Sequence, residues 1–149
     1  GTGISFSVAK RFAKEGFTIV MISRNSETLL SLQKKLTKLG YVSHCFKSDA
    51  GNFDQITQTL QQVQSEIGAT QVLVYNAAAS FSGEPTKITA EQTVDDFKIN
   101  VAGALASAQA VIPAMKKAGS GTLIFTGGGL ALEPLPSYAS GFPRSPSWR

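Results

Sequence analysis

GTGISFSVAKRFAKEGF (residues 1–17) joins a glycine turn, Gly1-Thr2-Gly3, directly to a segment whose apolar residues recur at helical spacing. In a doubly wound α/β sheet, a turn of this kind follows a buried strand. Its glycines let the backbone approach a phosphate, and the first N–H groups of the helix are free to bind it. Glycine pairs also occur in ordinary loops, so the stretch alone fits either a nucleotide-binding turn or a simple helix start.

The rest of the chain alternates between short apolar runs and longer segments of helical periodicity. The apolar runs predict strands that are buried on both faces of a parallel sheet. They cover residues 18–23 (TIVMIS), 41–46 (YVSHCF), 71–75 (QVLVY) and 122–126 (TLIFT). Strands separated by helices at this spacing predict an α/β fold, a doubly wound parallel sheet of the Rossmann-like type with helices on both faces.

Helical segments are expected between these strands. Apolar stripes predict helices at about residues 29–39 and 53–67, and each stripe stops at a glycine that suits a helix C-terminus. The sequence from Thr89 to Gln92 resembles a capping box and predicts a helix start. A longer helix is expected over about residues 97–117, with Pro113 as its weak point.

The composition indicates one globular domain and excludes several classes of protein. Hydrophobic residues make up 42% of the 149 residues and charged residues 16%, which is too apolar for a disordered chain. The lysines are spread over several segments and the net charge is only +4, so we expect no nucleic-acid partner. No apolar run approaches membrane-spanning length and no signal peptide is visible, so we expect no membrane partner and a cytoplasmic location. One cysteine and one histidine exclude a disulfide framework and a pair of histidine zinc ligands, and we expect no metal.

The end of the run at residues 18–23 points to a cofactor. It leads into Ser23-Arg24-Asn25, where the ribose of a dinucleotide lies in a doubly wound sheet. An acidic residue there favours NAD by bonding the 2′-hydroxyl, whereas an arginine can accept a 2′-phosphate. Arg24 therefore favours NADP over NAD. A solvated arginine at a helix start is the alternative interpretation.

The segments GTGIS, KSDAGN, YNAAAS and FKINVAG follow one another in this order along the chain. Together they resemble the short-chain dehydrogenase/reductase family, and the resemblance covers nearly the whole chain. Gly3 matches the middle glycine of the family's Gly-x-x-x-Gly-x-Gly motif, whereas Ser5 stands at the third. KSDAGN resembles the segment whose acidic residue, here Asp49, meets the adenine ring. YNAAAS resembles the family's Asn-Asn-Ala-Gly, and FKINVAG closely matches the segment with the catalytic asparagine, here Asn100.

The resemblance implies binding of NADP, with NAD as the alternative, by residues of these segments. The implied cofactor-binding residues are Gly1, Thr2, Gly3, Ile4, Ser23, Arg24, Asp49, Ala50, Asn76 and Ala77. In the family, the first strand precedes the glycine turn and lies between the strands that correspond to residues 18–23 and 71–75 here. We therefore expect a fragment that starts after this strand, with two strand edges left unpaired.

The catalytic end departs from the family pattern. The family transfers hydride between a nicotinamide and an alcohol or carbonyl compound, using a tyrosine, a lysine four residues later and a serine. Tyr138 matches the tyrosine, but Phe142 stands at the lysine position and Gly128 at the serine position. Tyr138 and Asn100 therefore remain as the catalytic candidates. Without a nearby cation, a tyrosine keeps a pKa of about 10 and serves poorly as a base.

We expect a partial NAD(P)-binding domain at residues 1–136 and an irregular tail, rich in serine and proline, at residues 137–149. Three hypotheses follow for the function. The first is an NADP-dependent oxidoreductase represented by an incomplete chain, with an unknown small-molecule substrate. The second is a module that binds a dinucleotide without catalysis, which the missing serine and lysine favour for the chain as written. The third is an interaction domain without a ligand, against which Arg24, Asp49 and Asn76 argue. The sequence leaves open whether the full-length protein forms a homo-oligomer.

Overall fold

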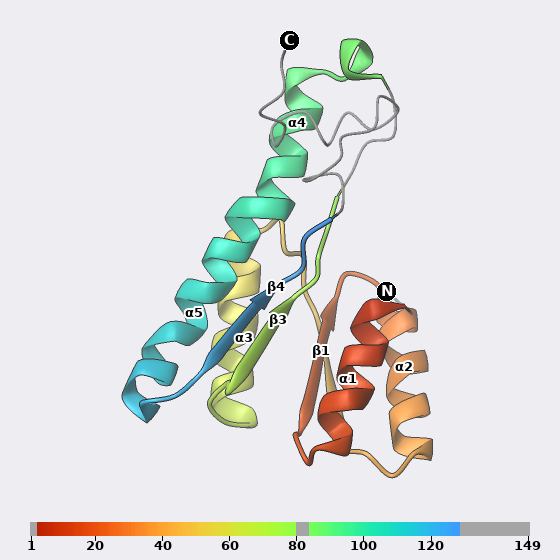
Figure 1. Ribbon diagram of the computed structural model, residues 1–149, viewed down its shortest axis with the longest axis vertical. Coiled ribbons are helices and arrows are strands. Elements are labelled where there is room, and N and C mark those ends of the chain that lie inside the picture. The colour runs from red at the N-terminus through yellow and green to blue at the C-terminus, as the bar shows by residue number, and fades with distance from the viewer. Residues whose placement is uncertain (1–2, 80–83, 129–149) are drawn as a thin grey trace.

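The computed structural model describes residues 3–79 and 84–128. Gly1, Thr2 and Tyr138, for which roles are expected, lie outside these ranges, as does the tail from residue 137. Helices and strands follow one another as shown in Figure 1, in the order α1 (Ile4–Lys14), β1 (Ile19–Ser23), α2 (Ser26–Lys38), β2 (Ser43–Lys47), α3 (Phe53–Glu66), β3 (Val72–Tyr75), η1 (Pro85–Lys87), α4 (Ala90–Phe97), η2 (Lys98–Ala102), α5 (Gly103–Ala118) and β4 (Thr122–Phe125).

The strands are parallel, which confirms the predicted fold class. β1 pairs with β2, with Ile19 opposite Ser43, and β3 pairs with β4, with Val72 opposite Thr122. The four predicted apolar runs are all strands, and their ends differ from the prediction by at most two residues. In the parallel arrangement, the carboxyl ends of all strands lie at one edge of the fold.

Helices cover both faces of the strands. On one face, α1, β1 and α2 contribute the buried cluster of Ala9, Ala13, Ile19 and Leu36. On the other face, α3 and α5 contribute the buried cluster of Ile56, Leu60, Val111 and Met115. Met21 packs against the first cluster and its neighbour Ile22 against the second, because successive strand residues point to opposite faces. β1 is therefore covered on both sides, which explains its continuous apolar sequence.

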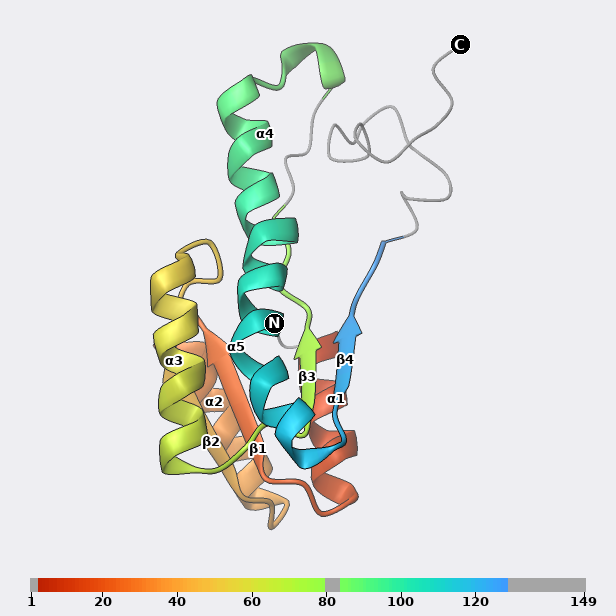
Figure 2. The ribbon, with the colours of Figure 1, turned by 90° about the vertical axis from the view of Figure 1, so that its left-hand side faces the viewer.

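The long helical segment before β4 begins earlier than predicted. Thr89 forms the capping box expected from the sequence and starts α4, which passes without a break into the π-helical turn η2 and then into α5 (Figure 2). The predicted start near Phe97 is thus wrong, because the pattern at residues 97–103 marks the π-turn inside a continuous helix rather than a new helix. Pro113 lies inside α5, which continues to Ala118. None of the helices within the described ranges has the length and apolarity needed to cross a membrane.

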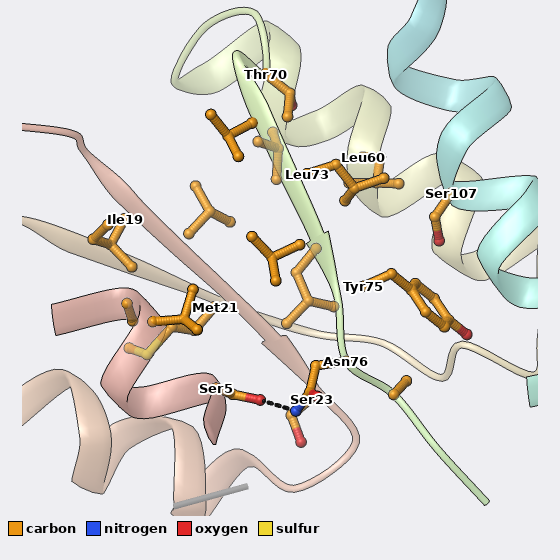
Figure 3. A pocket seen from close by; sticks show the side chains of 18 of the residues that line it. Ser5, Ile19, Met21, Ser23, Leu60, Thr70, Leu73, Tyr75, Asn76 and Ser107 are labelled. Atoms are coloured by element: carbon orange, nitrogen blue, oxygen red, sulfur yellow. Dashed lines mark hydrogen bonds between the residues drawn. The ribbon is translucent and has the colours of Figure 1, made fainter. Parts of the chain in front are cut away.

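A cavity separates the two strand pairs. β1 and β3 are not hydrogen-bonded to each other, and within the described residues no strand lies between them. A cavity of about 890 Å³ extends along both strands, and Figure 3 shows Met21 and Leu73 on its opposite sides. This is the place at which the resemblance puts the family's first strand.

Candidate functional site

The expected cofactor residues in the described part of the chain lie at one edge of the fold. Three strands end there, and each is followed by a turn that carries some of these residues. They are Ser23 at the end of β1 and Arg24 after it, Asp49 and Ala50 after β2, and Asn76 and Ala77 after β3. Ser23, Arg24, Asp49, Ala50, Asn76 and Ala77 all line the cavity between β1 and β3. Ligands of doubly wound sheets bind at this edge, outside the carboxyl ends of the strands.

At the same edge, the first backbone N–H groups of α1 have no hydrogen-bond acceptor among the described residues. Gly3 is the N-cap residue and supplies no side-chain cap, and the first turn contains no acidic residue. The first hydrogen bond of the helix runs from the N–H of Ser7 to the carbonyl of Gly3. The N–H groups before Ser7, with the positive end of the helix dipole, are therefore suited to an anion. Ile4 is 65% exposed, so its side chain does not bury this turn.

Arg24 is exposed between a strand and a firmly capped helix. Asn25 caps α2, its side chain accepting a hydrogen bond from the N–H of Thr28 at 2.8 Å. The backbone on both sides of Arg24 is therefore fixed by β1 and by this cap. Among the described residues, Arg24 takes part in no ion pair, whereas Arg11 on α1 pairs with Glu15. Its guanidinium is thus available to an anion at the cavity mouth.

Asp49 organises the turn after β2. Its Oδ1 accepts a hydrogen bond from the N–H of Gly51 at 2.9 Å, and its own N–H donates to Oε1 of Gln55 at 3.0 Å. This turn is packed closely against the start of α5. A Cβ placed on Gly103 would lie 2.2 Å from the carbonyl oxygen of Ala50, so only glycine fits at this position. The turn expected to meet the adenine ring is therefore held by the helix that follows Asn100.

Asn76 connects three elements through its side-chain amide. Nδ2 donates to Oγ of Ser5 on α1 at 2.7 Å, a contact drawn in Figure 3. Oδ1 accepts a hydrogen bond from Oγ1 of Thr126, just after β4, also at 2.7 Å. The amide is therefore held by one hydroxyl partner on each side. Ala77, the next residue, is exposed.

Asn100 lies on the π-turn η2, and its side chain pairs with the backbone of Ala79. Its Oδ1 accepts from the N–H of Ala79 at 2.9 Å and its Nδ2 donates to the carbonyl of Ala79 at 2.8 Å. The amide thus fixes the segment that follows β3. Among the described residues, the Asn100 side chain therefore contacts backbone groups. Tyr138 lies outside these residues, so the distance between the two catalytic candidates is not described.

Tyr75, for which no role was expected, holds the π-turn. Its hydroxyl donates to the carbonyl of Ile99, directly before Asn100, and only 8% of the residue is exposed. Burial, and secondarily the negative charge of Asp49, raise the pKa of the Tyr75 phenol. A signal was present in the sequence, because Tyr75 precedes Asn76 in YNAAAS and so replaces the first asparagine of the family motif.

The end of β4 lacks the expected serine hydroxyl. Gly128, at the serine position, is exposed, and a Cβ placed on it would meet no atom within 4 Å. The nearest hydroxyl in sequence, that of Thr126, donates to Asn76 instead. In the part of the chain that the structure describes, no three potential ligands among His, Cys, Asp and Glu gather as a metal site. Within the described residues, this edge therefore gathers the candidate cofactor residues but has no hydroxyl at the serine position.

Comparison with known proteins gives consistent matches. A family model described as short chain dehydrogenase matches residues 1–140. The oxidoreductase asL5 of Sarocladium schorii is 30% identical over 142 residues, which is 93% of this chain and 56% of that protein. A gluconate 5-dehydrogenase from Burkholderia cenocepacia J2315, solved with NADP and tartrate, superimposes with a TM-score of 0.86 at 22% identity, covering 97% of this chain and 58% of that one.

A second solved structure, a variant of actinorhodin polyketide ketoreductase with NADPH, has a TM-score of 0.88 and 23% identity, and covers 95% of this chain and 56% of that one. At such identities these structures establish the fold alone. The chain spans little more than half the length of each of these proteins.

Proposed function

Since the chain belongs to the short-chain dehydrogenase family, we propose that it binds NADP(H) at the carboxyl edge of β1, β2 and β3. The whole protein would be an oxidoreductase that transfers hydride between this cofactor and an alcohol or carbonyl compound. The observation that carries the choice of NADP is Arg24, exposed at the end of β1 and free of an ion pair among the described residues. The 2′-phosphate distinguishes NADP from NAD and needs such a cation.

The groups at this edge fit the parts of a dinucleotide. The glycine turn and the start of α1, with Gly1, Thr2, Gly3 and Ile4, would bind the pyrophosphate through backbone N–H groups. Ser23 and Arg24 would bind the adenosine ribose and its 2′-phosphate, Asp49 and Ala50 the adenine, and Asn76 and Ala77 the part nearer the nicotinamide. The cofactor supplies the hydride chemistry, and the protein supplies binding and orientation. NADP or NADPH in two solved structures of the same fold supports this assignment.

The catalytic groups support only weak turnover by the chain as written. In the family pattern Tyr138 would exchange the proton, but Phe142 and Gly128 provide neither a cation for its phenol nor a hydroxyl for the substrate carbonyl. Losing general acid–base assistance costs about 10²- to 10⁴-fold in rate. Gly128 and the engagement of Thr126 by Asn76 favour the second candidate function, dinucleotide binding without catalysis.

Titration of NADPH and NADH tests the cofactor assignment. NADPH should bind to the wild type more tightly than NADH. Arg24→Ala should weaken the binding of NADPH by roughly ten- to a hundredfold, because charged hydrogen bonds to a phosphate are lost, and should leave the affinity for NADH unchanged. Arg11→Ala is the matched control, since it removes the same charge from an ion-paired site on α1. Equal affinities of the wild type for both cofactors, or an unaltered preference in Arg24→Ala, would refute the proposal.

A turnover assay separates the two candidate functions. Oxidation of NADPH by residues 1–149 with a panel of ketones and aldehydes should stay near the uncatalysed background. Tyr138→Phe is the control, because it removes the remaining proton donor of the family pattern. Robust turnover that Tyr138→Phe abolishes would show a working catalytic site and exclude the non-catalytic candidate.

A further inference from the structure

The hydrogen-bond chain from Thr126 through Asn76 to Ser5 joins the two halves of the fold. Asn76 donates to Ser5 and accepts from Thr126, and both distances are 2.7 Å. Within the described residues, the Asn76–Ser5 contact is the only side-chain hydrogen bond between residues 3–47, which contain β1 and β2, and residues 48–128, which contain β3 and β4. β1 and β3 share no backbone hydrogen bond. This polar chain (Ser5, Asn76 and Thr126) therefore fixes the start of α1 against the end of β3.

Ser5 is a departure of this chain from its family. The third glycine of the family motif falls on this residue, and a glycine has no side chain with which to receive the Asn76 amide. Ser5 is half-buried in the first turn of α1 and lines the cavity (Figure 3). Its neighbour Ser7 is exposed on the same helix and, in the part of the chain described, donates no side-chain hydrogen bond. The contact thus belongs to Ser5 in particular.

Thr126 holds the Asn76 amide from the side opposite Ser5. Its Oγ1 donates to Oδ1 of Asn76, and Nδ2 donates to Ser5, so the amide is held between two hydroxyls, one from each half of the fold. Oγ1 of Thr126 also lies 3.4 Å from the carbonyl oxygen of Tyr75. The hydroxyl of Ser5 accepts from Asn76 and keeps its own proton for another acceptor. Thr126, just after β4, therefore helps to hold in place the amide that contacts the first turn of α1.

We propose that Ser5 and Thr126 are positioning residues, which act through Asn76 to hold the first turn of α1 where its N–H groups bind the pyrophosphate of the cofactor. This inference rests on the proposed binding of NADP(H). It assigns the polar chain to the pyrophosphate and not to the adenosine end, because Arg24 and Asp49 lie on the separate turns after β1 and β2.

The decisive experiment compares two ligands on matched variants of the full chain. NADPH contains the pyrophosphate, whereas adenosine 2′-monophosphate contains only the adenosine and the 2′-phosphate. Ser5→Ala should weaken the binding of NADPH about three- to tenfold, which is the contribution of one ordinary hydrogen bond. The affinity for adenosine 2′-monophosphate should stay unchanged. Thr126→Val should weaken NADPH in the same direction, Ser5→Thr should restore binding because it keeps the hydroxyl, and Ser7→Ala should change neither ligand.

Three results of this binding comparison would overturn the proposal. The first is an unchanged NADPH affinity in Ser5→Ala. The second is an equal loss of affinity for both ligands in Ser5→Ala, which indicates a general structural role. The third is tighter NADPH binding in Ser5→Gly, which indicates that Ser5 obstructs the turn. Amide hydrogen exchange of the cofactor-free protein provides an independent measurement. Exchange in the first turns of α1 and at residues 76–79 should be faster in Ser5→Ala than in Ser7→Ala.

The exchange measurement keeps the two proposals separable. If the wild type binds no NADPH, the proposed function fails, and the role assigned here to Ser5 fails with it even where exchange shows that the polar chain exists. If the wild type binds NADPH and exchange at α1 is the same in all variants, the polar chain is rejected while the proposed function stands.

Discussion

The two halves of the molecule have the same architecture, a pair of parallel strands with helices, but differ in how regular their helices are. Residues 3–47 form α1, β1, α2 and β2, and residues 48–128 form α3, β3, α4, η2, α5 and β4. Each half contains one pair of parallel strands covered by helices. In the first half the helices are regular, and α2 and β2 are linked by contacts such as that from the Gln33 side chain to the carbonyl of Ser43. In the second half a π-turn interrupts the helix and side-chain amides bind distant backbone groups.

The difference lies where the proposed chemistry requires it. The regular half contributes a helix start and an arginine, and both need only the correct end of a strand or helix. The irregular half contributes Asn76, which is held between two hydroxyls, and Asn100, whose amide points in one direction because it pairs with both backbone groups of Ala79. Tyr75 and the backbone of Ala79 provide the contacts that hold η2 and Asn100. π-Turns often occur at functional sites because they reorient side chains that a regular helix would spread around its axis.

The halves are joined by a limited set of contacts. Ile22 of β1 packs against the cluster of Ile56, Leu60, Val111 and Met115, and Asn76 binds Ser5. Within the described residues, β1 and β3 are not paired, and a cavity lies between them. We therefore expect the two halves to open separately, with each core residue stabilising mainly its own half.

The largest effect is expected from core truncation, which tests this separation. Leu36 is fully buried in the first cluster, and Leu60 is 3% exposed in the second cluster but also lines the cavity (Figure 3). Leu36→Ala should lower the free energy of unfolding by about 2–5 kcal/mol. Leu60→Ala should cost less than Leu36→Ala, because Leu60 has fewer packing partners on its cavity side. Chemical denaturation measures the free energy of unfolding of each variant, and amide exchange shows which segments are destabilised.

Exchange should accelerate mainly in α1, β1, α2 and β2 for Leu36→Ala, and mainly in α3, β3, α5 and β4 for Leu60→Ala. Leu30 on α2 is 54% exposed and provides the control. Leu30→Ala should change the free energy of unfolding and the exchange rates only slightly. Equal acceleration throughout the chain in both core variants would show that the halves unfold as one unit.

Much of the fold was predictable because burial leaves a local pattern. β1 is covered by α1 and α2 on one face and by α3 and α5 on the other, so every position is apolar until the turn at Ser23. Caps are equally local, and Thr89 binds Gln92 as its sequence spacing indicates. Such signals act within a few residues of the chain, which is why the strand ends were predicted to within two residues.

The geometry of the site was less predictable because its contacts are distant in sequence. Asn76 and Ser5 are 71 residues apart, and Tyr75 lies 24 residues from Ile99. No local pattern encodes such pairs, so the π-turn was interpreted as a helix start at Phe97. The motifs identified which residues to examine at the strand ends, but tertiary packing determines which partner each amide binds.

A medium effect is expected at the contact between α5 and the turn after β2. A Cβ on Gly103 would lie 2.2 Å from the carbonyl oxygen of Ala50 and 2.7 Å from the hydroxyl of Tyr75. Gly103→Ala should therefore destabilise the protein by about 1–3 kcal/mol, although alanine is the better helix former. Gly127→Ala is the control, since its Cβ would meet nothing within 4 Å. Similar melting temperatures for the two variants would show that α5 does not touch this turn.

The smallest effect is expected at Tyr75, and it depends on pH. Tyr75→Phe removes the hydrogen bond to the carbonyl of Ile99 and should cost about 0.5–1.5 kcal/mol at neutral pH. Burial, followed by the charge of Asp49, raises the pKa of Tyr75 in the folded protein above the value of about 10 for an unfolded tyrosine. The unfolded chain therefore releases this proton first as the pH rises. The stability from the protonated phenol is fully present below about pH 10 and is lost as the pH rises toward the folded-state pKa.

The wild type should accordingly lose stability more steeply than Tyr75→Phe above pH 10, and the two curves should converge. Urea denaturation at closely spaced pH values measures this difference. Tyr41→Phe is the matched control, because Tyr41 packs against the first cluster and its hydroxyl makes no hydrogen bond within the described residues. If Tyr75→Phe and the wild type differ by a constant amount at every pH, the phenol is not buried beside Asp49. The irregular half would then need another explanation for its π-turn.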